Sequence, residues 1–205
     1  MMNQAQKSAA ERWQDSAVTG HSTPPRTISD PDTTSSFSSL RPGKLGPSIE
    51  KVEGNLLDQK VAAIVNAWNQ NLIPYWLLVT QGVSGAIKRV AGNQPFKDLR
   101  QFGVLPLGAA RLTEAGKLSD RFKGIIHVAG INHLWNSSEW SVRESVRNAL
   151  AIASEQQFES VAFPAIGAGS SGIWGVSEKR SLEFIEDEVK RSDYSGRVVI
   201  VKFKK

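Results

Sequence analysis

The stretch FPAIGAGSSGIWG, residues 163–175, decides the fold because it sets a glycine-rich loop between an apolar run and a polar, periodic segment. Within it, residues 167–172 read G-x-G-x-x-G. SVAFPAI (160–166) predicts a buried strand, and VSEKRSLEFIEDEVKRS (176–192) predicts a helix. Glycines let backbone N–H groups approach an anion, and a following helix adds a positive dipole. We interpret the loop as a diphosphate cradle, with a plain tight turn as the alternative.

Three enzyme motifs with similar glycines do not fit this stretch. A Rossmann fingerprint opens its domain and needs an acid after a second strand, about 20 residues further on. The acids near that distance, Glu186 and Glu188, fall inside the predicted helix. A P-loop requires Gly-Lys-Ser or Gly-Lys-Thr where Ile173 and Trp174 follow. The chain also has no G-x-S-x-G elbow of the hydrolases.

Composition narrows the class of protein further. The 205 residues are 40% hydrophobic and contain no cysteine, which excludes disulfides and thiolate zinc sites. The three histidines have no metal-ligand spacing, so we expect neither metal nor cofactor; His127 reads as a core histidine or one supporting a site from behind. The chain has no apolar run of the roughly 20 residues that a membrane span needs, and no secretory signal pattern. We expect a cytoplasmic monomer without membrane contact.

The chain divides into two parts. Residues 1–48 include GHSTPPRTISDPDTTSSFSSLRPGKLGP, whose few apolar residues have no period, so we predict a disordered tail. Residues 49–205 alternate strands and helices, which predicts one α/β domain with a mixed, mostly parallel sheet. The strands are expected at 61–67, 108–116, 124–131, 160–166 and 197–203, and the helices at 82–92, from 137 onward and at 176–192.

A second set of polar residues lies far upstream of the glycine loop. VAAIVNAWNQN (61–71) places Asn66 and Asn69 just past the end of a predicted buried strand. Carboxamides offer donors and acceptors that suit the adjacent hydroxyls of a ribose. Gly82 and Val83 then form another glycine turn that leads into a helix. Because ligands of α/β sheets bind at the carboxyl ends of strands, these groups predict one crevice for a nucleotide diphosphate and a sugar.

Seven segments in order carry a resemblance to a known family. They are VEGNLLD, VAAIVNAWN, GVSGAIKRVAG, LGAARLTEAG, GIIHVAG, SVRNALAIA and SVAFPAIGAGSSG, between Val52 and Phe203. This combination resembles the macrodomains, the ADP-ribose-binding α/β modules. The resemblance implies a three-layer α/β/α sandwich that binds ADP-ribose, free or attached to a protein, at the ends of its strands.

The resemblance also implies roles for individual residues. Asn55 falls where the family usually has an acid that holds the adenine amino group, and Leu56 lies beside it. Asn66 and Asn69 fall near the distal ribose. The two phosphate loops are implied to consist of Gly82 and Val83, and of Gly167, Ala168, Gly169, Ser170, Ser171, Gly172 and Ile173. Trp174 either stacks on the ligand or packs in the core.

Three departures from the family pattern bear on activity. Asn55 replaces an acid, although an amide oxygen still accepts a hydrogen bond from adenine. Residues 70–81 lack the family's glycine run and carry IPYWLL instead, either as an apolar wall over the ribose or as a packed loop. Ser84 stands where hydrolytic members often carry Asp, and serine is a poor base.

We therefore expect binding of ADP-ribose and hydrolysis of ADP-ribosyl adducts, on proteins or in O-acetyl-ADP-ribose. The candidate catalytic residues are Asn66, Asn69 and Ser84. One alternative is a reader that binds ADP-ribose without turnover. The other is a nucleic-acid-binding module that uses the net charge of +5, although the positive residues are spread among acids, as on a solvated surface.

Overall fold

The computed structural model describes residues 46–70, 82–168 and 175–204. These residues form a six-stranded sheet in the order β1-β6-β5-β2-β4-β3. All neighbouring strands are parallel except β3 and β4, so the predicted mixed, mostly parallel sheet is confirmed. The strands are β1 (Ser48–Gly54), β2 (Ala63–Asn69), β3 (Ala110–Thr113), β4 (Gly124–Ile131), β5 (Ser160–Pro164) and β6 (Arg197–Phe203). The helices are α2 (Gly82–Ala91), α3 (Gln94–Arg100), α4 (Glu139–Glu155) and α5 (Glu178–Arg191), with 3-10 turns at Leu56–Asp58 and Gly116–Leu118.

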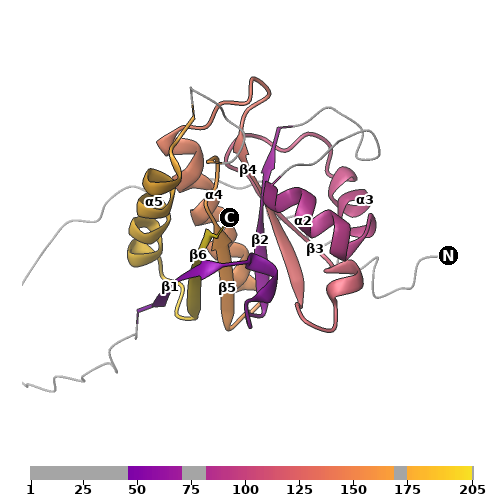
Figure 1. Cartoon of the computed structure of the whole chain (residues 1–205), viewed down its shortest axis with the longest axis horizontal. Coiled ribbons are helices and arrows are strands. Elements are labelled where there is room, and N and C mark those ends of the chain that lie inside the picture. Colours follow the sequence, from indigo (N-terminus) through magenta and orange to yellow (C-terminus); the bar gives the residue numbers. More distant parts are fainter. Residues whose placement is uncertain (1–45, 71–81, 169–174, 205) are drawn as a thin grey trace, which may run out of the picture. The chain divides into compact units, whose positions relative to one another are not determined.

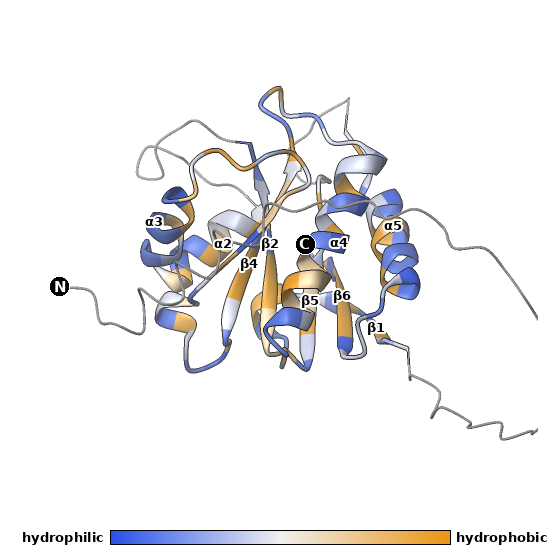
Figure 2. Cartoon of the chain, turned by 180° about the vertical axis from the view of Figure 1, so that it is seen from behind, coloured by the Kyte–Doolittle hydropathy of each residue, from blue (hydrophilic) through white to orange (hydrophobic). Residues whose placement is uncertain are grey.

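Helices cover both faces of the sheet, with α4 and α5 on one side and α2 and α3 on the other (Figure 1). Adjacent strand residues point to opposite faces, so Val65 and Ile126 pack in the cluster with α4 and α5, whereas Ile64 and Ile125 pack in the cluster with α2 and α3. Figure 2 shows the result, with apolar strands between helices that carry polar outer faces. The predicted three-layer α/β/α sandwich is confirmed.

Local sequence signals set most helix ends. Ser138 is the N-cap of α4, and its side chain accepts a hydrogen bond from the Ser141 N–H at 3.1 Å. Gly92 follows α2 with φ 80°, a left-handed conformation that ends helices and that glycine adopts without strain. The seven-residue helix α3 was not predicted, because it is too short to show a helical period and carries a proline in its first turn.

Strand β2 extends further than the sequence suggested. It pairs with β4 as far as Asn69, opposite Ile131, so Asn66 and Asn69 lie within the strand and not beyond it. The register shifts between Trp68 and Asn69, at an irregularity of the ladder. β1 begins at Ser48, one residue before the expected domain start. The predicted tail lies almost entirely outside the described residues, and among those described no helix is long and apolar enough to cross a membrane.

Candidate functional site

Asn66 occupies the centre of the sheet. It lies on β2 beside His127 of β4, and its side chain is fully buried. The Nδ2 atom of Asn66 lies 2.9 Å from Nδ1 of His127. The Oδ1 atom has no hydrogen-bond partner. Because a buried polar atom without a partner costs free energy, this oxygen is a candidate acceptor for a donor from outside the chain, a water molecule or a ligand.

His127 connects Asn66 to strand β3. Its Nε2 atom lies 2.9 Å from Oγ1 of Thr113, and the Thr113 hydroxyl donates to the carbonyl oxygen of Glu114 at 3.1 Å. The ring of Phe96 meets the imidazole edge-on, with the ring centres 5.5 Å apart. Burial lowers the pKa of His127 from 6.5 to about 3, so the imidazole is neutral at physiological pH. The interpretation of His127 as a core histidine is confirmed.

Asn69, the last residue of β2, and Ser84 of α2 contribute two further buried polar atoms. The Oδ1 atom of Asn69 and the Oγ atom of Ser84 have no hydrogen-bond partner either. Ser84 is in the first turn of α2, which packs on β2 through the apolar cluster that holds Ile64 and Ile87. The candidate catalytic residues Asn66, Asn69 and Ser84 therefore share one property, an unpartnered polar atom inside the protein.

The residues of the predicted first phosphate loop begin α2. Gly82 is the first residue of the helix, is exposed, and has φ 61°. An L side chain there would be strained, so the turn favours glycine. Val83 packs against the apolar cluster beneath α2. The first backbone N–H groups of a helix have no intrahelical acceptor and are available to an anion.

Ser137 holds the two ends of the second phosphate loop together. Its hydroxyl donates to the carbonyl oxygen of Gly167 at 2.9 Å and accepts from the N–H of Val176 at 2.9 Å. Gly167 has φ 76°, and a Cβ atom on it would lie 2.6 Å from Cβ of Ser137. Only glycine therefore fits beside Ser137. Ala168 is half-buried, and the other predicted loop residues, 169–173, lie outside the described part of the chain together with Trp174.

Asn55 and Leu56 follow β1 with contrasting exposure. Asn55 is exposed and caps the turn Leu56–Asp58, where its Oδ1 atom accepts from the Leu57 N–H at 3.1 Å. One lone pair of that oxygen remains for another donor. Leu56 is buried in the apolar cluster next to α2. Sequence reasoning missed Phe203, which is 59% exposed and pairs with Gly54, the residue before Asn55.

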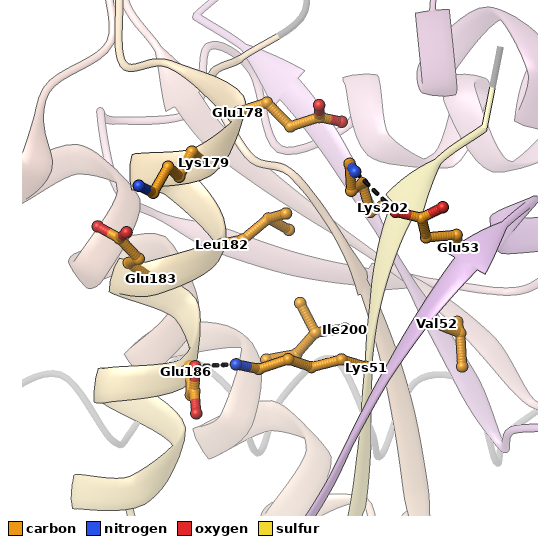
Figure 3. Close-up of a pocket in the computed structure, with 10 residues that line it drawn as sticks. All are labelled: Lys51, Val52, Glu53, Glu178, Lys179, Leu182, Glu183, Glu186, Ile200 and Lys202. Carbon is orange, nitrogen blue, oxygen red and sulfur yellow. Dashed lines mark hydrogen bonds and ion pairs between the residues drawn. The ribbon is translucent and has the colours of Figure 1, made fainter.

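A groove of about 490 Å³ lies elsewhere, between α5 and the strands β1 and β6 (Figure 3). Lys51 pairs across it with Glu186 of α5 at 2.5 Å, and Lys202 pairs with Glu53 of the neighbouring strand at 2.7 Å. None of the predicted site residues that the structure describes lines this groove. Within 46–70, 82–168 and 175–204, no group of His, Asp and Glu side chains could hold a metal ion.

The arrangement defines a class of α/β domains, those with polar side chains and glycine turns at the carboxyl ends of parallel strands. Comparisons with known proteins identify the class more closely. The family model described as Macro domain matches residues 65–182. The chain therefore belongs to the macro domain family.

Relatives and solved structures agree with this assignment. An O-acetyl-ADP-ribose deacetylase of Salmonella newport is 36% identical over 160 residues, which cover 74% of this chain and 82% of that protein. The Oceanobacillus iheyensis macrodomain, solved with ADP, is 26% identical with a TM-score of 0.64, covering 77% of this chain and 84% of that one. A mutant of that macrodomain with ADPR superposes with a TM-score of 0.62 at 26% identity, covering 75% and 83%.

Proposed function

We propose that this protein binds ADP-ribose and hydrolyses ADP-ribosyl adducts, on proteins or in O-acetyl-ADP-ribose. The observation that carries the proposal is that Asn66 Oδ1, Asn69 Oδ1 and Ser84 Oγ are three of the four buried side-chain polar atoms without partners in the described residues, the fourth being Ser145 Oγ on α4. The first two atoms lie on β2, and the third lies on α2, the helix that begins at the first glycine turn. Hydroxyl groups of a sugar would satisfy them, which supports a ribose in this position.

In this proposal the adenine of the ligand lies at the carboxyl ends of β1 and β6. Asn55 Oδ1 keeps one lone pair for the adenine amino group. The exposed ring of Phe203 offers a stacking surface for the adenine. It lies beside Asn55 in the sheet, because Phe203 pairs with Gly54, the residue directly before Asn55. The diphosphate then lies between Gly82 and Gly167, whose positive φ angles let backbone N–H groups turn toward an anion.

Hydrolysis of an adduct bonded to the anomeric carbon requires a water molecule near that carbon, whereas O-acetyl-ADP-ribose requires the water at the carbonyl carbon of its acetyl ester. Cleavage of a glycosidic bond passes through an oxocarbenium-like state, and the adjacent diphosphate can stabilise that positive charge and accept the proton of the water. Asn66 would fix the ribose with respect to this water. The name of the Salmonella newport relative, an O-acetyl-ADP-ribose deacetylase, supports the hydrolytic part of the proposal.

A second candidate function is that of a reader that binds without turnover. Ser84 favours it, because a buried hydroxyl without a partner supplies no base at neutral pH. Calorimetric titration with ADP-ribose and with ADP tests binding. Release of ADP-ribose from ester-linked and serine-linked peptides, and turnover of O-acetyl-ADP-ribose, test hydrolysis. Absence of heat with ADP-ribose at millimolar concentration would exclude the site, whereas tight binding without release from any substrate would leave the reader.

The proposal includes a cytoplasmic, monomeric protein. Neither property follows from the site, so each has its own test: fractionation of cells that express the protein, and light scattering of the purified chain. A steep salt dependence of RNA binding, without any response to ADP-ribose, would instead support the nucleic-acid module.

A further inference from the structure

Asn66 has a carboxamide whose two ends have different surroundings. The nitrogen lies 2.9 Å from Nδ1 of His127, and the oxygen has no partner. The two ends of a carboxamide are almost identical in shape, so the neighbouring hydrogen bonds decide which end faces which way. The orientation of Asn66 therefore depends on whether Nδ1 of His127 carries a proton.

Strand β3 determines that proton's position. A carbonyl oxygen only accepts hydrogen bonds, so the Thr113 hydroxyl uses its single hydrogen on Glu114. The same hydroxyl oxygen lies 2.9 Å from Nε2 of His127 and must accept there, which places the imidazole proton on Nε2. Nδ1 is then a bare acceptor, and Asn66 can meet it only with its NH2 group.

The surroundings of His127 keep this arrangement in place. The imidazole is fully buried, and Phe96 packs edge-on against it. Burial also holds the pKa of His127 near 3, so a charged ring, which would donate from both nitrogens, does not form at neutral pH. With the Thr113 hydroxyl donating to Glu114, the Nε2–H tautomer satisfies Thr113 and Asn66 together.

We propose that His127 is a positioning residue, which through its Nε2–H tautomer holds the NH2 group of Asn66 and presents the Asn66 oxygen as an acceptor to a ribose hydroxyl. This inference rests on the proposed function, because it takes the sugar as the group that meets Asn66. It adds a chemical requirement: the ligand must donate a hydrogen bond at this point. The affinity for ADP, which lacks the second ribose, should therefore not depend on His127.

The experiment compares the affinities of ADP-ribose and ADP by calorimetry for the wild type and two variants. His127→Phe fills the space but removes the acceptor, and we expect its Kd for ADP-ribose to rise about tenfold while its Kd for ADP changes less than about twofold. His127→Asn is the matched control, since its amide oxygen can occupy the position of Nδ1. We expect it to restore most of the ADP-ribose affinity.

Equal losses for both ligands in His127→Phe, or no loss for either, would overturn the proposal. Failure of the wild type to bind either ligand would instead refute the proposed function. If His127→Phe does not fold, 15N NMR of the histidine side chains in the wild type gives an independent test. We expect a protonated Nε2 and an unprotonated Nδ1 for His127, and Thr113→Val should shift the tautomer ratio. A signal from protonated Nδ1 in the wild type would overturn the assignment.

Discussion

The two ends of the Asn66 amide differ, because the nitrogen lies against His127 and the oxygen has no partner. We predict that Asn66→Ala slows release of ADP-ribose from an ester-linked peptide by about 100-fold, because the ribose loses its fixed orientation. Its affinity for free ADP-ribose should fall by about tenfold or less, since the adenine and diphosphate contacts remain. Single-turnover rates and calorimetry on the same preparations separate the two effects.

Ser84 distinguishes an enzyme from a reader at the level of one residue. Its Oγ atom has no partner, and a neutral serine cannot accept a proton at pH 7. If hydrolysis rests on ribose positioning, Ser84→Ala should leave the release rate within about threefold of the wild type. If it rests on a carboxylate, the wild type should bind without turnover and Ser84→Asp should create activity. A hundredfold lower release rate in Ser84→Ala would contradict both explanations, ribose positioning and a required carboxylate.

His127 also makes stability depend on pH. Its pKa of about 3 in the folded state lies below 6.5, the ordinary value, so the unfolded chain binds the extra proton between these two pH values. Stability is therefore full above pH 6.5 and falls as the pH drops toward 3. Between pH 7 and 5 the wild type should lose about 2 kcal/mol more free energy of unfolding than His127→Asn. Urea unfolding at both pH values tests this, and parallel pH profiles would show that His127 is not buried as a neutral ring.

At the scale of elements, Ser137 connects the segment after β4 with the ends of the second glycine loop. Ser137→Ala removes the hydrogen bonds to Gly167 and Val176, and we predict that the Kd for ADP-ribose rises about five- to tenfold. Ser154→Ala, an exposed serine of α4, is the control and should bind like the wild type. Unchanged calorimetric affinity in Ser137→Ala would show that the loop keeps its geometry without this bridge.

Helices α4 and α5 are joined by a buried carboxylate. Glu188 is 3% exposed and bonds to Arg143 at 2.9 Å and to Arg147 at 3.0 Å. Glu188→Gln should lower the free energy of unfolding by roughly 1–3 kcal/mol, because three arginines, Arg143, Arg147 and Arg191, lose a charged partner in a partly buried place. Glu183→Gln on the same helix breaks only an exposed pair with Arg180 and should cost less than about 0.5 kcal/mol. Equal urea midpoints for the two variants would contradict this difference.

For the whole molecule, ligand binding should raise the melting temperature. At about 100 times its Kd, ADP-ribose adds roughly 2.7 kcal/mol to the free energy of unfolding. For a domain of this length the expected shift is about 5–10 °C. Adenosine, which lacks the diphosphate and the second ribose, serves as the control in the same calorimetric scan. No shift with ADP-ribose would count against the binding proposal as a whole.

Most helices and strands could be predicted from the sequence because the signals for them are local. The apolar run 124–131 and the capping serine Ser138 predict β4 and the start of α4 from neighbouring residues alone. Gly92 similarly marks the end of α2. Strand β3 proved shorter than the segment 108–116: Ala110–Thr113 form the strand, while Gly108 and Ala109 still bond to Ala129 of β4. Its antiparallel direction could not be predicted, because pairing depends on residues distant in the chain.

By itself, then, the sequence determined which residue types stand at the ends of strands and in glycine turns, since periodicity and backbone propensity act over a few residues. The tertiary structure alone decided which of them meet. Asn66 and His127 are 61 residues apart, and Ser137 is 30 residues from Gly167, yet each pair shares a hydrogen bond. The order of the strands and their register bring these atoms together, because burying both faces of the sheet fixes each strand against its neighbours.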